Sequence, residues 1–287
     1  MPFTVIEGVY HVVGKSPDGD SVGFRANDPA NWTKLSGPPT KLNGQGVAQL
    51  RFEAIDALET HFTPTTHPVE THQPTALAEA AQTFMLDQIG ITDLVWSPGH
   101  RTVVSATNDD APGFIIARSV EKNRRPVAFV FAGSPPVADG SSIFLDVPLL
   151  EQSVNFKLAR EGLVYPTYYR GLFHDLRDSL TATVQAARAA NAGVWANDAT
   201  NSGVQALMNV LQDTTPILPK LFRRLMEYME GQDDNIGNFL SFMQAKGDAL
   251  TVLSTGQFTH LDTLIDVDVA GNTVKLLKPP EDLVFDE

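Results

Sequence analysis

The stretch from Val47 to Glu59 constrains this chain more than any other. Residues 47–55 mix β-branched and aromatic side chains with polar ones at roughly period two, which predicts a strand. The end of that strand carries Arg51, Asp56 and Glu59. A guanidinium can grip phosphate through two parallel hydrogen bonds, and carboxylates can hold a metal ion or a water molecule. This combination suits phosphodiester chemistry.

The composition limits the class of protein. The chain has 287 residues, 43% of them hydrophobic, enough for one large domain or two small ones. It has no cysteine, so disulfides and thiolate metal sites are excluded. No apolar run reaches membrane-spanning length, and the first residues lack the features of a secretory signal. We therefore expect a cytoplasmic protein with no membrane partner.

The chain is acidic, and its charge is unevenly distributed. A formal net charge of −13 at pH 7 argues against binding of nucleic acid by the whole surface, but a small focused site is compatible with it. Residues 201–287 hold 6 Lys and Arg against 13 Asp and Glu, so this segment is the more acidic per residue. Its apolar stripe at Leu218, Leu221, Leu225 and Met229 is typical of a helix that packs on another surface.

The order of the expected elements indicates an α+β fold, because strands come first and helices are inserted and appended. Strands are expected at residues 3–13, 21–25, 47–55, 94–96, 102–106, 114–118, 126–132 and 142–145. Helices are expected at about 74–89, from the cap Asp146 to just before Gly162, and at 172–191, 205–211, 218–229 and 236–245.

Four short motifs occur in a fixed order along the first two thirds of the chain. They are Asp18-Gly19-Asp20-Ser21, the stretch from Arg51 to Glu59, the strand Arg125-Pro126-Val127-Ala128-Phe129-Val130-Phe131, and the segment from Val154-Asn155 to Gly162-Leu163. Together they resemble the staphylococcal nuclease (thermonuclease) family over about residues 4–198. The resemblance implies a five-stranded OB-type β-barrel packed by helices. It places a nuclease domain at residues 1–200. Residues 201–287 are then expected to be an acidic, mainly helical extension docked on the barrel.

The resemblance also implies a metal site. Asp20, Asp56 and the backbone carbonyl of Ala57 match the family's calcium ligands, and oxygen ligands suit this hard cation. Ala57 stands where the family pattern has threonine, a change that a carbonyl ligand survives.

Three residues match the family's catalytic set. Arg51 and Arg125 correspond to two arginines that stabilise the charge growing on the phosphorane oxygens, and Glu59 to the residue that orients or deprotonates the attacking water. Arg124 makes the second arginine ambiguous by one position. The apolar alternation of strand 126–132 favours Arg125. Lys122 and Tyr168 match family residues near the phosphate and the nucleotide.

One feature of the strand requires a special backbone geometry. Arg51 and Asp56 are an odd number of residues apart, so an ideal strand would point their side chains to opposite faces. A site that uses both requires a bulge, or a strand that ends before Asp56.

The expected function is calcium-dependent hydrolysis of DNA, RNA or both, with little sequence selectivity. By resemblance, the bond to the 5′-oxygen breaks and a 3′-phosphate remains. The alternatives are a barrel that binds nucleic acid without cutting it, and a zinc hydrolase built on the loop with His61, His67, Glu70 and His72. The complete set of catalytic residues favours the enzyme.

Overall fold

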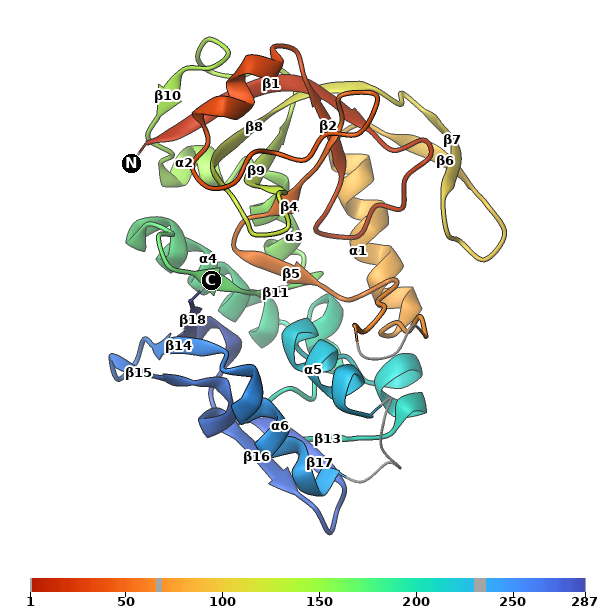
Figure 1. The fold of residues 1–287 in the computed structure, drawn as a ribbon, viewed down its shortest axis with the longest axis vertical. Coiled ribbons are helices and arrows are strands. Elements are labelled where there is room, and N and C mark those ends of the chain that lie inside the picture. Colours follow the sequence, from red (N-terminus) through yellow and green to blue (C-terminus); the bar gives the residue numbers. More distant parts are fainter. Residues whose placement is uncertain (1, 66–68, 230–235, 287) are drawn as a thin grey trace. The chain divides into compact units, whose positions relative to one another are not determined.

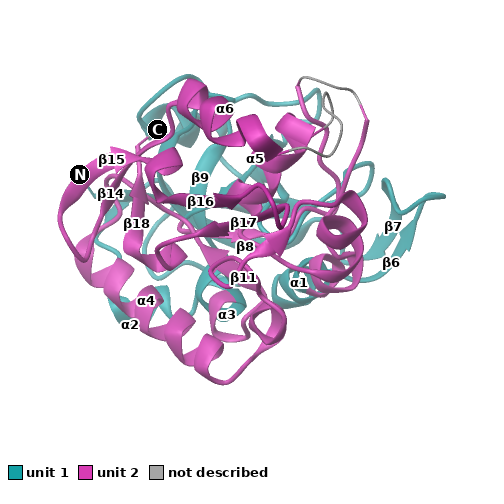
Figure 2. Cartoon of the chain, turned by 90° about the horizontal axis from the view of Figure 1, so that it is seen from below, with its two compact units in different colours: residues 1–53, 81–158 teal, residues 54–80, 159–287 magenta. Residues whose placement is uncertain are grey.

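The computed structural model describes residues 2–65, 69–229 and 236–286, and it shows a mixed α+β protein (Figure 1). The chain divides into two compact units (Figure 2). Unit 1 comprises residues 1–53 and 81–158, and unit 2 comprises residues 54–80 and 159–287. The chain therefore passes between the units three times, and no boundary falls near residue 200, where the sequence suggested one.

Unit 1 is built on a sheet that nearly closes into a barrel. Along the sheet the order is β3-β2-β1-β8-β9-β4, with β10 paired to the start of β1. Only Leu50 separates β3 from β4, so the two ends of the sheet belong to one stretch of chain. The strands are β1 (Phe3–His11), β2 (Gly23–Ala26), β3 (Ala48–Gln49), β4 (Arg51–Phe52), β8 (Ala111–Val120), β9 (Pro126–Ala132) and β10 (Ser142–Ile143).

Tyr10 of β1 packs in the core of the barrel against β8 and β9. Tyr10 is fully buried, and its hydroxyl donates toward the carbonyls of Phe114 and Phe131, at 2.8 and 2.9 Å. Gly113 lets this ring approach β8, because a Cβ there would lie 2.3 Å from the Tyr10 ring. A larger residue at position 113 would therefore displace the Tyr10 ring from its place against β8.

The expected strand 47–55 is interrupted, as a shared site for Arg51 and Asp56 requires. It divides into β3, β4 and β5 (Ile55–Ala57), and Ala54 has a φ of +70°. Asn155 supports the break, because its side-chain amide donates to the carbonyls of Glu53 at 2.9 Å and Ala128 at 3.1 Å. Asn155 is fully buried. One buried side chain therefore satisfies the carbonyl that the interrupted ladder leaves open.

Further elements of the first 160 residues agree with the sequence patterns. The helix expected after Asp146 is split, and Asp146 caps its first part by accepting from the backbone N–H of Leu149 at 2.9 Å. Gly162 follows the second part with a φ of +70°. These elements are α1 (Thr75–Gln88), β6 (Thr92–Trp96), β7 (Val103–Thr107), α2 (Val147–Leu150) and α3 (Val154–Arg160).

Unit 2 combines helices with short strands. The sheet order is β12-β18-β14-β15 in one sheet and β13-β17-β16 in another, and β5 pairs with β11. The helices are α4 (His174–Ala189), α5 (Pro219–Met229) and α6 (Phe239–Lys246). The strands are β11 (Val164–Pro166), β12 (Tyr168–Tyr169), β13 (Val204–Gln205), β14 (Ala249–Val252), β15 (Gln257–His260), β16 (Ile265–Asp268), β17 (Thr273–Leu276) and β18 (Leu283–Phe285).

The C-terminal segment combines helices with strands that the sequence patterns did not indicate. After residue 200, the described residues carry six short strands besides α5 and α6. The helix expected at 205–211 is β13 followed by a helical turn at Val210–Thr214. The last third of the chain instead shares unit 2 with residues 54–80 and 159–200: the Gln73 amide donates to the carbonyl of Ile217 at 2.8 Å, and β12 pairs with β18.

Candidate functional site

Unit 1 brings together three of the expected site residues. The backbone N–H of Phe52 donates to the carbonyl of Asp20 at 2.9 Å, so the Asp18–Ser21 turn lies against β4. Arg51 of β4 is paired with Val127 of β9, two residues after Arg125. Asp20, Arg51 and Arg125 therefore lie on neighbouring chain segments at one end of the nearly closed sheet.

Arg125 and Arg124 have different partners. The Arg125 Nε donates to Glu121 Oε1 at 3.2 Å, whereas the Arg124 Nε donates to the carbonyl of Pro39 at 2.9 Å. Burial tends to raise the pKa of Glu121, but the backbone N–H of Asn123 and the charge of Arg125 together lower it below 4.5. Glu121 thus holds the Arg125 guanidinium as a charged pair. Lys122 lies on the same turn and is exposed.

Unit 2 carries the remaining part of the expected metal and water-activating set. Asp56 lies in the middle of β5, opposite Tyr165 of β11, and its side chain is only 5% exposed. Glu59 follows two residues after the strand ends. The loop that carries Glu59 is fixed by Gln73, because the Gln73 N–H donates to the Glu59 carbonyl at 2.9 Å and the Gln73 side chain accepts from the Glu59 N–H at 3.3 Å.

Both carboxylates contact a residue that the sequence patterns did not single out. Arg223 of α5 donates to the two oxygens of Asp56 at 3.1 and 2.7 Å. It also donates to Glu59 Oε1 at 2.5 Å. Burial alone would lower the pKa of Arg223, but the charges of Asp56 and Glu59 hold it well above its ordinary value. Two carboxylates and one guanidinium leave this triad with a formal charge of minus one.

The group formed by Asp56, Glu59 and Arg223 determines whether the expected calcium ion can bind to Asp56. The oxygen ligands have the right chemistry for calcium. However, the fork of Arg223 engages both oxygens of Asp56, and a cation cannot take those lone pairs while the guanidinium holds them. In this arrangement Asp56 does not fit a calcium ion.

Tyr168 does not lie where a nucleotide could stack on it. Its ring is fully buried, and its hydroxyl is 3.0 Å from that of Thr181. Burial raises its pKa. Tyr165 is also fully buried and donates to Asp198 at 2.8 Å. Stacking needs an open ring face, so both tyrosines are part of the core of unit 2 in this structure.

The histidine loop shows no metal arrangement among the residues that the structure describes. His61 Nδ1 is 2.8 Å from the hydroxyl of Thr60, and His72 Nδ1 is 3.1 Å from the carbonyl of Gln73. His67 lies outside the described residues. The loop is therefore held by local hydrogen bonds at the two described histidines.

A different group in unit 1 could hold a metal ion. Ligand atoms of His11, Asp109 and Asp110 lie within 4.8 Å of one another. His11 Nδ1 is 3.0 Å from an oxygen of Asp109 and 3.1 Å from one of Asp110. Arg25 donates to Asp110 at 2.9 Å, and the backbone N–H of Val12 donates to Asp109 at 2.7 Å. The same contacts also fasten the end of β1 to the turn between β7 and β8.

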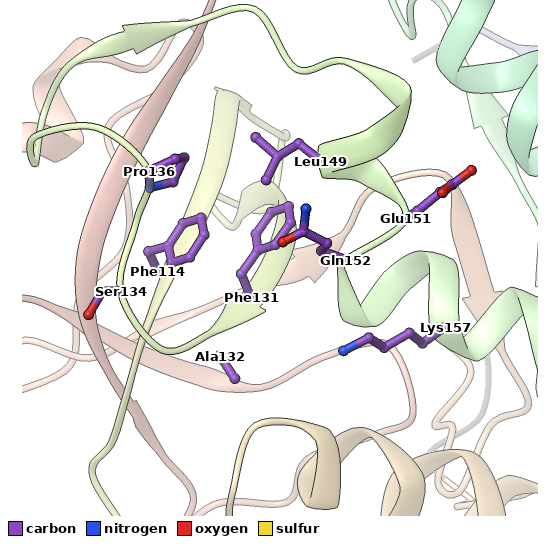
Figure 3. A pocket seen from close by; sticks show the side chains of 9 residues that line it. All are labelled: Phe114, Phe131, Ala132, Ser134, Pro136, Leu149, Glu151, Gln152 and Lys157. Atoms are coloured by element: carbon purple, nitrogen blue, oxygen red, sulfur yellow. The ribbon is translucent and has the colours of Figure 1, made fainter.

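A pocket of about 450 Å³ opens in unit 1 away from the residues expected to be functional. Phe114 and Phe131 line it, with their rings stacked at a centroid distance of 4.7 Å. Figure 3 shows Gln152 and Lys157 at its polar edge. None of the expected catalytic, metal-binding or substrate-binding residues lines it, so the pocket is not part of the candidate site.

No protein-family model matches the chain, and no curated protein matches it. Within the parts of the chain that the structure describes, no helix is both long and apolar enough to cross a membrane. The likeness to the nuclease family therefore depends on the four sequence motifs alone.

Arg223 contacts two of the expected site residues, although the sequence patterns did not point to it. A signal was present, since Arg223 lies on α5 between the buried positions Leu221 and Leu225, where a basic residue must find an acidic partner or solvent. Its partners, however, are 164 and 167 residues away in the sequence. No local spacing could have connected them.

Proposed function

We propose that the protein is a phosphodiester hydrolase, a nuclease that cuts DNA, RNA or both with low sequence specificity. The observation that carries this proposal is the grouping of Asp20, Arg51 and Arg125 on neighbouring segments of unit 1. Guanidinium groups at one end of a sheet can bind a phosphate and stabilise added negative charge on it. The four motifs in order support the same activity.

In the proposed reaction, a water molecule attacks the phosphorus and the bond to the 5′-oxygen breaks. Arg51 and Arg125 donate hydrogen bonds to the phosphorane oxygens, whose charge grows in the transition state. Glu59 accepts a proton from the attacking water. The leaving 5′-oxygen takes up a proton from solvent, and the products are a 3′-phosphate and a 5′-hydroxyl.

We also propose that unit 1 is a five-stranded OB-type barrel. If β3 and β4 are counted as one strand, the ring of unit 1 has five strands and closes where β4 runs parallel to β9. A five-stranded closed ring with one parallel pair supports an OB-type barrel, a fold whose faces and loops bind oligonucleotides. The net charge of −13 restricts such binding to a focused basic site.

Calcium is proposed as the cofactor of a form in which Arg223 has left Asp56. Asp20, Asp56 and the carbonyl of Ala57 would then be its protein ligands, and the ion would supply electrophilic stabilisation of the phosphate. Lys122 is exposed and is proposed as a phosphate contact. The burial of Tyr168 leaves it no proposed contact with substrate.

A second candidate is a barrel that binds nucleic acid without cutting it. The observation that favours it is the pairing of Asp56 and Glu59 with Arg223, since this pairing occupies the groups that would hold the metal ion and activate the water.

To test the proposal, the purified protein is incubated with labelled DNA or RNA in the presence of calcium, magnesium, zinc or a chelator, and cleavage is measured. The matched control is the variant Arg51→Ala/Arg125→Ala, purified in the same way, which removes the proposed phosphate-binding groups and so exposes any contaminating nuclease. Cleavage by the wild type alone, with 3′-phosphate ends, is the expected result. Binding without cleavage in every metal ion would support the second candidate, and equal cleavage by the double variant would contradict the proposal.

A further inference from the structure

The guanidinium of Arg223 holds the carboxylate oxygens that a divalent cation would need as ligands. Its two terminal nitrogens contact both oxygens of Asp56 and one oxygen of Glu59. Paired donors in this geometry make the strongest hydrogen bonds that a carboxylate forms with a side chain. Arg223 and a cation therefore compete for the same lone pairs.

We propose that Arg223 is a built-in competitor of the metal ion, which keeps the site latent until a divalent cation displaces it. The inference deepens the proposed function and rests on it in one respect, the assignment of Asp56 as a metal ligand. It concerns regulation of that site: the helix α5 supplies the inhibitory group, and the cation is the activator.

The backbone of α5 is firmly held, so displacement involves the side chain. Phe222 and Leu225 are fully buried, and Met226 accepts a hydrogen bond from the hydroxyl of Thr71 at 3.6 Å. On the same helix, Arg224 donates to both oxygens of Asp248 at 2.7 Å. The Arg223 side chain is 25% exposed, so rotation of the side chain can carry its charge into solvent without moving the helix.

The charge balance of the triad favours exchange with a divalent cation. Two carboxylates face a single guanidinium, and the side chains of Asp56 and Glu59 are only 5% and 15% exposed. A doubly charged ion would bring two positive charges to these two carboxylates, whereas Arg223 brings one. Because the attraction between charges grows with the charge of the ion and is strong where water is largely excluded, these carboxylates attract calcium more strongly than a monovalent ion.

The test measures calcium binding directly, by titration calorimetry and by the rise in Tm that calcium produces. The variants are Arg223→Ala and Arg223→Gln, with Arg224→Ala as the matched control, because Arg224 is the next residue of α5 and has its own carboxylate partners. We expect both Arg223 variants to bind calcium on the order of 10- to 100-fold more tightly than the wild type. Arg224→Ala should bind as the wild type does.

Two double variants test whether the gain in calcium affinity arises at Asp56. Arg223→Gln/Asp56→Asn should lose the gain in affinity, whereas Arg223→Gln/Asp109→Asn should keep it, because Asp109 belongs to the separate group with His11. Arg223→Gln keeps a long side chain that can form hydrogen bonds. It therefore allows the same binding measurement if Arg223→Ala does not fold. Unchanged calcium affinity in a folded Arg223 variant would overturn the proposal, as would a gain that survives Asp56→Asn.

The binding measurement separates this proposal from the proposed function. Tighter calcium binding by the Arg223 variants, with no cleavage of DNA or RNA, would sustain the competition and refute the nuclease. Loss of cleavage in Arg223→Gln with calcium affinity unchanged would refute the competition and make Arg223 part of the catalytic machinery.

Discussion

Arg188 of α4 holds Glu281 near the C-terminus through two hydrogen bonds of 2.6 and 2.7 Å. The Glu281 side chain is 4% exposed, and the Arg188 guanidinium also lies 4.3 Å from the centre of the Trp195 ring. The two residues are 93 positions apart in the sequence. This pair ties the helical turn Pro280–Asp282, which precedes β18, to α4.

The Arg188–Glu281 pair should be important for stability. Arg188→Ala leaves the Glu281 carboxylate buried without its partner, and we expect a loss of about 3–5 kcal/mol in the free energy of unfolding. Denaturant unfolding measures it. The control is Arg160→Ala, because Arg160 and Glu161 form an exposed pair whose side chains are 57% and 45% exposed. That change should cost less than about 0.5 kcal/mol. Equal losses in the two variants would contradict the prediction.

The two neighbouring arginines should differ in their effect on cleavage. Arg125→Ala removes a proposed donor to the phosphorane oxygens and should lower kcat by about 10²–10³. Arg124 donates to the carbonyl of Pro39 instead, so Arg124→Ala should leave kcat within a few-fold of the wild type. The measurement is steady-state cleavage of labelled DNA. The reverse order of effects would shift the assignment by one residue.

Glu59→Gln should lower the rate of cleavage and leave the stability of the fold almost unchanged. Because Glu59 is the proposed general base, its replacement by glutamine should lower kcat by a factor of roughly 10²–10⁴. Glutamine can still accept from Arg223, so the Tm should change little. Glu161→Gln, at an exposed position, serves as the control. A cleavage rate near that of the wild type would remove Glu59 from the mechanism.

Glu121 should make stability depend on pH in the acid range. Its folded pKa lies below its ordinary value of 4.5, because hydrogen bonds from Asn123 and Arg125 and the charge of Arg125 outweigh burial. A lowered carboxyl pKa contributes stability that is present above the unfolded value and is lost as pH falls through the folded value. Glu121→Gln should therefore be less stable than the wild type at pH 7, and the difference should shrink below pH 4.5. A pH-independent difference would show that the charge of Glu121 is unimportant.

A chain that ends at Asp198 should be much less stable than the full chain. It lacks β18, which pairs with β12, and Glu281, which neutralises Arg188. It also lacks Ile217, whose carbonyl accepts from Gln73. Because its acidic segment is gone, such a chain should bind nucleic acid at least as tightly at low salt. An unchanged Tm, or weaker binding at low salt, would each contradict one half of this prediction.

The first half of the fold could be predicted because its elements carry strong local patterns. The strand 126–132 and the helix near 74–89 were predicted with bounds close to those of β9 and α1. The break before Asp56 was also anticipated, from the odd spacing to Arg51. Its support by Asn155 could not be, because that residue acts through carbonyls 27 and 102 positions away.

The short strands of the last third of the fold were not predicted, for a physical reason. Its strands are only two to four residues long, and β14 and β17 alternate half-buried and buried positions too briefly to stand out from loops. The helix at 218–229 has a long apolar stripe and was predicted correctly as α5. The contacts of Arg223 with Asp56 and Glu59 could not be predicted, since these partners belong to a segment near the start of unit 2.

The three crossings between the units also set an order of events during synthesis. Unit 1 is complete once residue 158 has emerged, whereas the segment 54–80 must wait for the residues that follow 158. Glu59 leaves the ribosome 164 residues ahead of Arg223, which at 5–20 residues per second is an interval of roughly 8–30 s. During that interval the nascent chain presents Asp56 and Glu59 without their guanidinium. A cation that meets the growing chain can therefore reach these carboxylates before their internal competitor exists.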